Sequence, residues 1–374
     1  MLAAPNITYL TEIYFDFGAL KILPDLLKKY RISRPLVITD LGLVKLGIIE
    51  RLRIKQPSVF DQVETNPTEA MALAALEIYR TAGCDGIVAV GGGSPIDLAK
   101  GVGILVHHSP PLEQYAFVHG GMSKITSNIP PLIAVPTTSG SGSEVGRAAL
   151  LTVSDKQKMG LLSKYLIPIA TICDPELTLE LPPLLTAATG MDAISHCIET
   201  FCSPRYNPVA EAIGLDGLER GYQNILKATR NGFDRQARSE MMMCSLQGGL
   251  AFQKGLGAVH SLSHPLGALT ERRLHHGTLN AIFLPFVLRF NFEYCKEKMQ
   301  IIAKRLGIMD AFTLPDRFAQ LNRELSLPAR LRELGLTKED LEPLAKKAKE
   351  DHCTPTNPRP LQVEDCHQLY SEAL

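Results

Sequence analysis

A short apolar run, a triple glycine and the start of a helix follow one another in GIVAVGGGSPIDLAKG, residues 86–101. The glycines at 91–93 permit a tight turn and a close approach of the backbone to a ligand. Ser94, Pro95 and Asp97 fit the N-cap, N1 and N3 positions of the following helix. The exposed N–H groups and the dipole of such a helix start favour a bound pyrophosphate. The segment therefore predicts a strand–turn–helix unit, which either holds a phosphate group or is a plain β–α turn.

The first half of the chain repeats this alternation of apolar strands and helices. RPLVITD (34–40) and PLIAVP (131–136) have the composition of buried strands, and TEAMALAALEIYRTAG (68–83) has helical periodicity. Strands that alternate with helices predict a parallel sheet in an α/β domain.

The second half has a different pattern. LPPLLTAATGMDAISHCIETF (181–201) and NPVAEAIGLDGLERGYQNILKATR (207–230) show helical periodicity, and so does much of the chain after residue 230. The prolines at 182–183 restrict the backbone before them and can open a helix. We therefore predict an α/β domain over residues 1–180 and an all-α domain over residues 181–374.

The composition excludes several classes of function. With 374 residues, 39 basic and 39 acidic side chains and no basic block, the chain offers no nucleic-acid or anionic-membrane surface. No apolar run approaches the roughly 18 residues that a membrane span requires. The start, MLAAPNITYL, lacks the pattern of a signal peptide, and the eight scattered cysteines form no CxxC pair. We therefore expect a cytoplasmic protein with reduced thiols.

Two further loops bear on the glycine turn. Asp40 ends the strand at 34–40, where its carboxylate either accepts the hydroxyls of an adenosine ribose and repels a 2′-phosphate, or caps the next helix. PTTSGSGSE (136–144) follows the third strand and supplies hydroxyl groups that hydrogen-bond phosphate, ribose or nicotinamide, unless it is a flexible linker. Polar loops at neighbouring strand ends predict a Rossmann-like dinucleotide domain that prefers NAD to NADP.

The histidines are concentrated in the second half. HSLSHPLGALTERRLHHG (260–277) holds four of the chain's ten histidines. Asp192 and His196, and again His260 and His264, are spaced i, i+4, which places each pair on one helix face. One carboxylate with two or three imidazoles suits a divalent transition metal with an open position for substrate.

These segments together resemble one known family. GGGSPIDLAKG, PTTSGSGSEV, DPELTLELPP, GMDAISHCIE and HSLSHPLG…HHG occur in the order typical of the iron-containing alcohol dehydrogenases, and the resemblance covers nearly the whole chain. It implies an N-terminal dinucleotide-binding domain, a C-terminal helical metal-binding domain, NAD, ferrous iron (with zinc also acceptable to such ligands) and a homodimer. By the same resemblance the metal ligands are Asp192, His196, His260 and His276.

The resemblance also carries over further positions. His264 matches an active-site histidine near the nicotinamide, and is either a proton relay or a group that orients the cofactor. The positions that match NAD contacts are Asp40, Gly92, Gly93, Ser94, Thr137, Thr138, Ser141, Lys158 and Leu177. His275 competes with His276 for the fourth ligand position, and we choose His276 because the family ligand directly precedes a glycine.

Within the family, YLTEIYFDFGAL, GMDAISHCIETF and AFQKGLGAVHSLSHPLG most resemble the bacterial 4-hydroxybutyrate dehydrogenases. This implies reversible oxidation of 4-hydroxybutyrate to succinate semialdehyde, and a carboxylate substrate needs a cationic partner. Basic residues near the site segments are Arg147, Lys254, Arg272 and Arg273, of which we favour Arg147 and Lys254.

Other activities stay open beside this one. The first is a general short-chain primary alcohol or aldehyde oxidoreductase. A lyase of the dehydroquinate-synthase type shares this architecture, but one Asp with three His and the HPLG segment argue against it. A metal-free reductase of the maleylacetate type is disfavoured because all four ligand positions are retained. A non-enzymatic metal- or nucleotide-binding protein is disfavoured because the predicted cofactor and metal sites are expected to converge.

Overall fold

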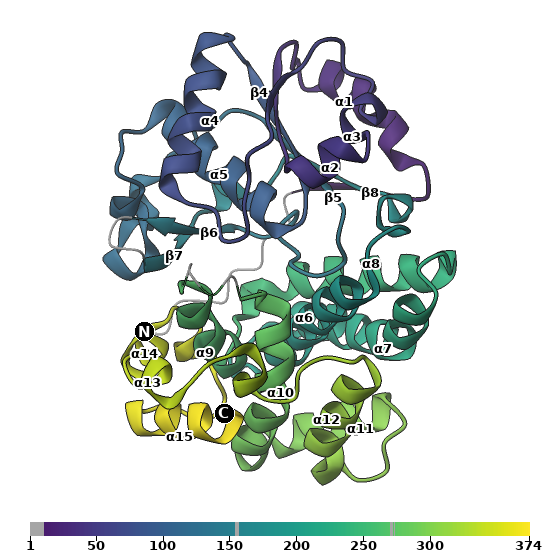
Figure 1. Ribbon diagram of the computed structural model, residues 1–374, viewed down its shortest axis with the longest axis vertical. Helices are drawn as coiled ribbons and strands as arrows, with labels where there is room; N and C mark the ends of the chain where they lie inside the picture. Colours follow the sequence, from purple (N-terminus) through teal and green to yellow (C-terminus); the bar gives the residue numbers. More distant parts are fainter. Residues whose placement is uncertain (1–10, 154–156, 270–271, 273) are drawn as a thin grey trace. The chain divides into compact units, whose positions relative to one another are not determined.

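The computed structural model describes residues 11–153, 157–269, 272 and 274–374. These residues divide into two compact units, which we call the N-terminal unit (11–179) and the C-terminal unit (180–374). The N-terminal unit is built on a parallel sheet and the C-terminal unit on helices, so the predicted combination of an α/β fold with an all-α fold is confirmed (Figure 1).

The N-terminal unit holds a six-stranded parallel sheet in the order β1-β8-β5-β4-β2-β3. Its strands are β1 (Glu12–Phe15), β2 (Pro35–Ile38), β3 (Ser58–Phe60), β4 (Gly86–Gly91), β5 (Leu132–Pro136) and β8 (Ala170–Cys173). An antiparallel pair, β6 (Ala148–Val153) and β7 (Gln157–Leu162), lies outside this sheet. The helices of the unit are α1 (Leu23–Lys29), α2 (Leu41–Lys45), α3 (Ile48–Arg51), α4 (Glu69–Thr81) and α5 (Gly93–His107).

Both faces of the sheet are covered. Leu36 and Ile38 of β2 pack into one apolar cluster with residues of α4 and α5. Val37, between them, packs into another cluster with residues of α1 and α3. Because successive side chains of a strand point to opposite faces, a strand buried on both faces must be apolar throughout. This explains the uninterrupted apolar runs of the sequence.

The order of the strands fixes where a ligand can reach the sheet. The chain leaves β2 for β3 toward one edge, and leaves β4 for β5 toward the other. Between the carboxyl ends of β2 and β4 the connections therefore diverge, which is where dinucleotides bind in open parallel sheets. The Asp40 loop follows β2 and the glycine turn follows β4.

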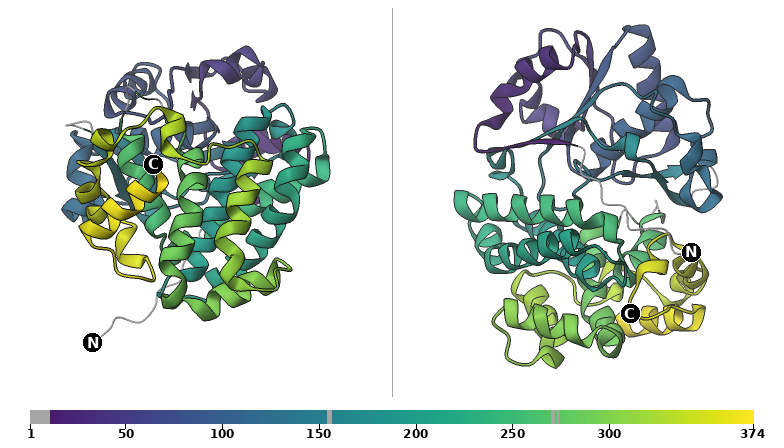
Figure 2. Two further views of the ribbon diagram at one scale, coloured as in Figure 1. Left: turned by 60° about the horizontal axis from the view of Figure 1, so that its bottom comes forward. Right: turned by 180° about the vertical axis from the view of Figure 1, so that it is seen from behind.

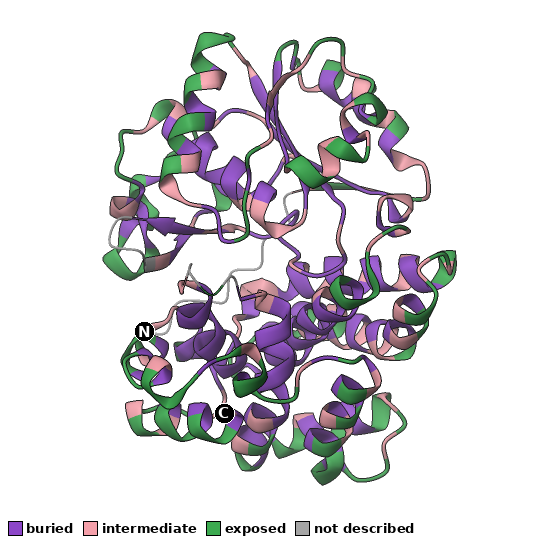
Figure 3. Ribbon diagram, viewed as in Figure 1, coloured by how far each residue is buried: buried purple, intermediate pink, exposed green. Residues whose placement is uncertain are grey.

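The C-terminal unit is a helical assembly around α6 (Pro183–Cys202), nearly all of whose residues from Thr186 onward are buried (Figure 3). The other helices are α7 (Pro208–Arg230), α8 (Arg235–Ala251), α9 (Ala258–Gly267), α10 (His276–Asn291), α11 (Lys296–Arg305), α12 (Leu314–Glu324), α13 (Lys338–Leu341), α14 (Leu344–Glu350) and α15 (Val363–Ala373). Helices α7, α8 and α10 pack against α6, and Figure 2 shows this bundle from two further sides.

Local signals set the helix starts. Pro183 stands at N1 of α6, and Asn207 caps α7 by accepting a hydrogen bond from the backbone N–H of Ala210 (3.0 Å). None of the helices among the described residues combines the length and apolarity needed to cross a membrane.

Candidate metal centre and nucleotide loops

Four side chains from three helices of the C-terminal unit converge on one point. Nε2 of His196, His260 and His276 lie 3.3, 3.6 and 3.7 Å from the same oxygen, Oδ1 of Asp192. Asp192 and His196 come from α6, His260 from α9 and His276 from the first turn of α10. Asp192, His196 and His260 are buried, and the side chain of His276 is 23% exposed. The resemblance-based ligand set is thus brought together in space.

A glycine allows this convergence. A Cβ on Gly277 would lie 2.2 Å from the carbonyl oxygen of Ala188, far inside contact distance. Only a residue without a side chain lets the start of α10 lie against α6 at this point. His276, the residue before it, is therefore carried to the carboxylate of Asp192.

The donor set fits a divalent cation. Burial favours the neutral carboxyl of Asp192, but the facing imidazoles hold its pKa well below the usual range, so the group is ionised. The amide nitrogen of Asn280 lies 2.7 Å from Oδ1 of Asp192 and 3.1 Å from Nε2 of both His260 and His276. The carboxylate and the imidazole nitrogens thus face one point, beside the amide of Asn280, where a bound cation would contact them together. One carboxylate with three imidazoles is a suitable ligand set for ferrous iron or zinc.

A buried carboxylate orients His260. Oε2 of Glu199 lies 2.5 Å from Nδ1 of His260, while Oε1 accepts the backbone N–H of Val259 at 2.7 Å. Burial alone would lower the pKa of His260, but Glu199 and Asp192 outweigh it and raise the pKa to about 9, so a cation that binds at Nε2 would displace a proton from that atom. With its Nδ1 proton directed at Glu199, the ring presents Nε2 to Asp192, the arrangement typical of metal-binding histidines.

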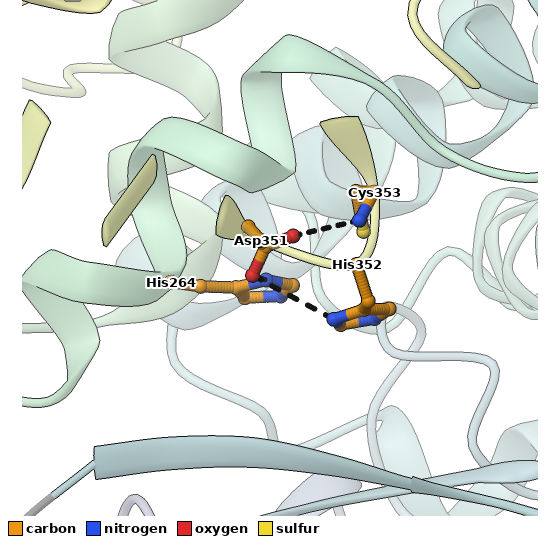
Figure 4. Close-up of side chains that lie close together, drawn as sticks. All are labelled: His264, Asp351, His352 and Cys353. Carbon is orange, nitrogen blue, oxygen red and sulfur yellow. Dashed lines mark hydrogen bonds and ion pairs between the residues drawn. The ribbon is translucent and has the colours of Figure 1, made fainter. Parts of the chain in front are cut away.

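His264 lies one turn after His260, and its Nδ1 faces a second group of residues (Figure 4). Its Nδ1 is 2.9 Å from Oδ2 of Asp351, and Nδ1 of His352 is 3.6 Å from the same oxygen. Burial lowers the pKa of His264 to about 4 against the opposing charge of Asp351, so the imidazole is neutral near pH 7. The sequence prediction missed Glu199, Asn280 and Asp351, although Glu199 falls one helical turn after His196 on α6.

In the N-terminal unit, the glycine turn and the hydroxyl-rich loop lie side by side. Strands β4 and β5 are paired so that Gly91 stands opposite Pro136, and the backbone N–H of Thr137 donates to the carbonyl of Gly91 (3.0 Å). A Cβ on Gly92 would lie 3.2 Å from Oγ1 of Thr138, and one on Gly93 would lie 2.9 Å from Cβ of Ser141. The absence of side chains at 92 and 93 thus permits the two loops to meet.

The start of α5 differs from the prediction. The helix begins at Gly93 with Gly92 at the N-cap, so Ser94 lies inside the first turn. Asp97 does not serve as a capping carboxylate, because it accepts hydrogen bonds from Oγ of Ser143 (2.5 Å) and the backbone N–H of Leu150 (3.1 Å). Its role is to tie α5 to the chain after β5, and the first-turn N–H groups stay directed out of the helix end.

A buried lysine completes this tie. Nζ of Lys100 lies 2.7 Å from the carbonyl of Ser143, 2.9 Å from that of Gly146 and 2.7 Å from that of Ala148. Burial lowers the pKa of Lys100 to about 8, against the opposing effect of Asp97. One ammonium thus fixes three carbonyls of the loop that follows β5.

The remaining cofactor positions are spread over this unit. Asp40 caps α2, accepting the backbone N–H of Leu43 on Oδ1 at 3.0 Å, so the capping alternative is realised and the side chain stands at the divergence of β2 and β4. Lys158 of β7 donates to Oδ1 of Asn66 (2.8 Å). Leu177 packs against the apolar cluster that includes residues of α1 and α3.

The basic residues considered as partners of a substrate carboxylate lie in different environments. Lys254 was a wrong choice: its ammonium is fully buried and donates to the carbonyls of Thr200 and Phe201 (3.0 Å each) at the end of α6, beside Glu211 (3.0 Å). An ammonium that donates to the last carbonyls of a helix and pairs with a carboxylate is not available to bind a ligand.

The other three differ in exposure and position. Arg272 is exposed and pairs with Asp340. Arg147 is half-buried just before β6, whereas Arg273 lies outside the described residues.

Comparison with known proteins assigns both halves of the chain to one family. Residues 11–175 match the family model described as iron-containing alcohol dehydrogenase, and residues 186–374 match the Fe-containing alcohol dehydrogenase family, C-terminal model. A 4-hydroxybutyrate dehydrogenase from Cupriavidus necator is 48% identical over 98% of this chain and 99% of its own length.

Solved structures agree with this assignment. A crystal structure of a 1,3-propanediol oxidoreductase superposes with a TM-score of 0.92 at 33% identity, covering 99% of this chain and 100% of that one. The sulfoacetaldehyde reductase of Bifidobacterium kashiwanohense, solved in complex with NAD+, has a TM-score of 0.89 at 26% identity, covering 98% of each chain. Since both family models match and the likeness extends over nearly the full length, the chain belongs to the iron-containing alcohol dehydrogenases.

Proposed function

We propose that this protein is an NAD-dependent dehydrogenase that oxidises 4-hydroxybutyrate to succinate semialdehyde, reversibly. The choice of substrate rests on the 48% identity to the 4-hydroxybutyrate dehydrogenase of Cupriavidus necator over nearly the whole of both chains. The convergence of Asp192, His196, His260 and His276 supports a metal-dependent reaction.

In this proposal, each unit has its own task. The α/β domain, residues 1–180, binds NAD at the divergence of β2 and β4, with the first-turn N–H groups of α5 directed at the pyrophosphate. Asp40 accepts from the adenosine ribose through the lone pairs that its helix cap leaves available. The contacts to the rest of the cofactor come from Gly92, Gly93, Ser94, Thr137, Thr138, Ser141, Lys158 and Leu177.

The helical domain, residues 181–374, holds the metal. When bound, ferrous iron supplies Lewis-acid polarisation of the substrate oxygen and NAD accepts the hydride. Glu199 keeps His260 in the tautomer that presents Nε2. His264 receives the hydroxyl proton of the substrate on Nε2, which a neutral imidazole can do.

Arg147 is the proposed partner of the substrate carboxylate. A buried carboxylate without a partner would be costly, whereas a charge-assisted hydrogen bond contributes about 1.5–3 kcal/mol. The side chain is half-buried and stands at the end of the loop held by Lys100. With Lys254 occupied at the end of α6, Arg147 is the candidate that we retain.

The deciding experiment measures NADH formation by iron-loaded protein with 4-hydroxybutyrate and with 1-butanol, for the wild type, Arg147→Ala and the control Arg272→Ala. We expect 4-hydroxybutyrate to be preferred, and Arg147→Ala to raise its KM about tenfold or more while leaving 1-butanol unaffected. If the wild type prefers 1-butanol, the protein is a general short-chain alcohol dehydrogenase. Equal effects of the two arginine variants would remove Arg147 from the site.

We further propose, from the family resemblance, that the protein is a homodimer in the cytoplasm with iron as its physiological metal. Light scattering after size-exclusion chromatography tests the dimer. Activity of the metal-free protein reconstituted separately with iron and zinc tests the metal, because zinc binds such ligands more tightly than ferrous iron in the usual affinity order.

A further inference from the structure

The two oxygens of Asp351 have separate partners. Oδ1 accepts the backbone N–H of Cys353 at 2.8 Å, and Oδ2 lies 2.9 Å from Nδ1 of His264 (Figure 4). The backbone contact restrains the rotation of the carboxylate and leaves the other oxygen facing the ring.

This contact decides the tautomer of His264. Burial alone would raise the pKa of Asp351, but the neighbouring imidazoles of His264 and His352 hold it well below the usual range. An ionised carboxylate only accepts hydrogen bonds, so the proton of the neutral ring must sit on Nδ1 and Nε2 must carry a lone pair. Nε2 is buried and has no hydrogen-bond partner among the residues that the structure describes. A buried acceptor without a partner is costly to maintain, which marks it as a group kept for a ligand.

Two other rings limit the movement of His264. The ring of His276 lies on one side, with centroids 5.4 Å apart and planes 12° apart. The ring of His352 is similarly parallel, with centroids 5.3 Å apart and planes 11° apart. His264 is therefore restrained by parallel rings as well as by the carboxylate at its edge.

We propose that Asp351 and His352 are positioning residues for His264: Asp351 fixes the Nδ1–H tautomer, and His352 fixes the plane of the ring. The consequence is that Nε2 is ready to accept the proton that leaves the substrate hydroxyl. This inference rests on the proposed function for the role of His264 in proton transfer, but the tautomer itself can be observed without any substrate.

The same residues suggest a second explanation. Single donor atoms of His264, Asp351, His352 and Cys353 all lie within 4.8 Å of one another, which is also compatible with a second metal ion. We favour positioning because Oδ2 of Asp351 and Nδ1 of His264 already satisfy one another directly. The experiments below therefore include a result that would indicate a second metal ion.

Asp351→Asn is the decisive variant. The N–H of Cys353 needs an acceptor, so the amide oxygen stays there and the amide NH2 turns to His264. A donor at that position forces Nδ1 to accept and moves the proton to Nε2. The matched control is Asp310→Asn, because Asp310 makes the same type of contact, to the backbone N–H of Phe312 (2.9 Å), on the exposed surface.

The first measurement is the ¹⁵N NMR spectrum of zinc-loaded holoenzyme with labelled histidine, in which His264 is assigned by comparison with His264→Gln. We expect a protonated Nδ1 and an unprotonated Nε2 in the wild type and in Asp310→Asn, and the reverse in Asp351→Asn. An Nε2-protonated ring in the wild type would overturn the proposal. So would two zinc ions per wild-type chain that fall to one in Cys353→Ser.

The second measurement is a double-mutant cycle of His264→Ala with Asp351→Asn in iron-loaded enzyme. We expect Asp351→Asn to lower kcat by about 10- to 100-fold with little change in KM, as for other residues that orient a functional histidine. In the His264→Ala background, Asp351→Asn should have no further effect, since it acts through the missing ring. Additive losses would mean that Asp351 acts independently of His264.

His352 is tested by a pair of variants. His352→Phe keeps a flat ring against His264 and should retain kcat within about threefold, whereas His352→Ala should lower it about tenfold or more. Equal kcat in the two variants would remove His352 from the proposal. If the wild type fails to oxidise 4-hydroxybutyrate, the proposed function fails, while the NMR result still decides the inference about Asp351.

Discussion

Glu199 lies 2.5 Å from Nδ1 of His260, on the edge of the ring opposite to the nitrogen that faces Asp192. Its other oxygen accepts the backbone N–H of Val259, so the carboxylate cannot rotate without breaking a buried hydrogen bond. In Glu199→Gln the amide oxygen should therefore remain at Val259 and the amide NH2 should face Nδ1. The proton of His260 then moves to Nε2, the atom that would bind the metal.

We expect Glu199→Gln to weaken metal affinity by about 10- to 100-fold, measured by competition with a chelator of known affinity. Glu211→Gln, which changes a glutamate that pairs with Lys254 and Lys298 and not with a histidine, is the control. Unchanged metal affinity in Glu199→Gln would show that the tautomer of His260 does not limit binding.

The choice between the two adjacent histidines can be tested directly. Nε2 of His276 lies 3.7 Å from Oδ1 of Asp192, while His275 is the N-cap residue of α10. We expect His276→Ala to lose the metal and all activity, and His275→Ala to keep one metal ion per chain. Elemental analysis of the purified variants measures this, and full occupancy in His276→Ala would reject the assignment.

Gly277 provides an independent check of the same geometry. Since a Cβ there would lie 2.2 Å from the carbonyl oxygen of Ala188, Gly277→Ala must displace the start of α10 from α6. We expect metal occupancy to fall although all four ligand residues are intact. A variant that binds metal normally would mean that the helices can separate without moving His276.

Cofactor preference is expected to depend on the charge of Asp40. Asp40→Asn keeps an oxygen for the cap of α2 and removes the negative charge, whereas Asp40→Gly removes both at a cost to the cap of a few tenths of a kcal/mol. Both variants should use NADP better, by about tenfold in kcat/KM, because repulsion of the 2′-phosphate is gone. A wild type that uses NAD and NADP equally well would contradict the role given to Asp40.

A buried carboxyl group predicts a pH-dependent stability. Burial raises the pKa of Glu144 from 4.5 to about 7, although Lys100 opposes the shift. Between these values the folded protein binds a proton that the unfolded chain does not. The free energy of unfolding contributed by this group is therefore greatest below pH 4.5 and falls as the pH rises through 7.

Glu144→Gln, which mimics the protonated group, should match the wild type near pH 5 and exceed it at pH 8. The expected gain is of the order of 2–3 kcal/mol, or several degrees in Tm. Thermal unfolding monitored at both pH values measures it. A lower Tm for the variant at pH 8 would show that the charged form of Glu144 is stabilised by contacts that Gln cannot make.

Much of the fold was predictable because its signals are local. The apolar runs at β2, β4 and β5 are buried on both faces, and prolines and asparagine mark the starts of α6 and α7. Strands β1, β3, β6, β7 and β8 were not predicted, since runs of three to six residues carry no distinctive period.

The sequence indicated the four side chains that converge on Oδ1 of Asp192, but not the residues that support them. Asp192 and His196 share a helix face, so their spacing is visible in the sequence. Asp351 meets His264 across 87 positions of the chain, a pairing that only tertiary packing creates. For Lys254, closeness in the sequence was misleading. We placed it in the site because it lies near His260 in the sequence, but its ammonium donates hydrogen bonds to the carbonyls at the end of α6.

Lys100 performs the task that a bound cation performs in other loops, because its ammonium gathers the carbonyls of Ser143, Gly146 and Ala148. Because this ammonium belongs to a side chain of the protein, a chelator cannot remove it and a competing ion cannot replace it. The shape of the loop that follows β5 therefore does not depend on a bound metal ion. If this loop binds NAD as proposed, the metal-free protein should keep its affinity for NAD, and removal of the metal should lower kcat without weakening cofactor binding.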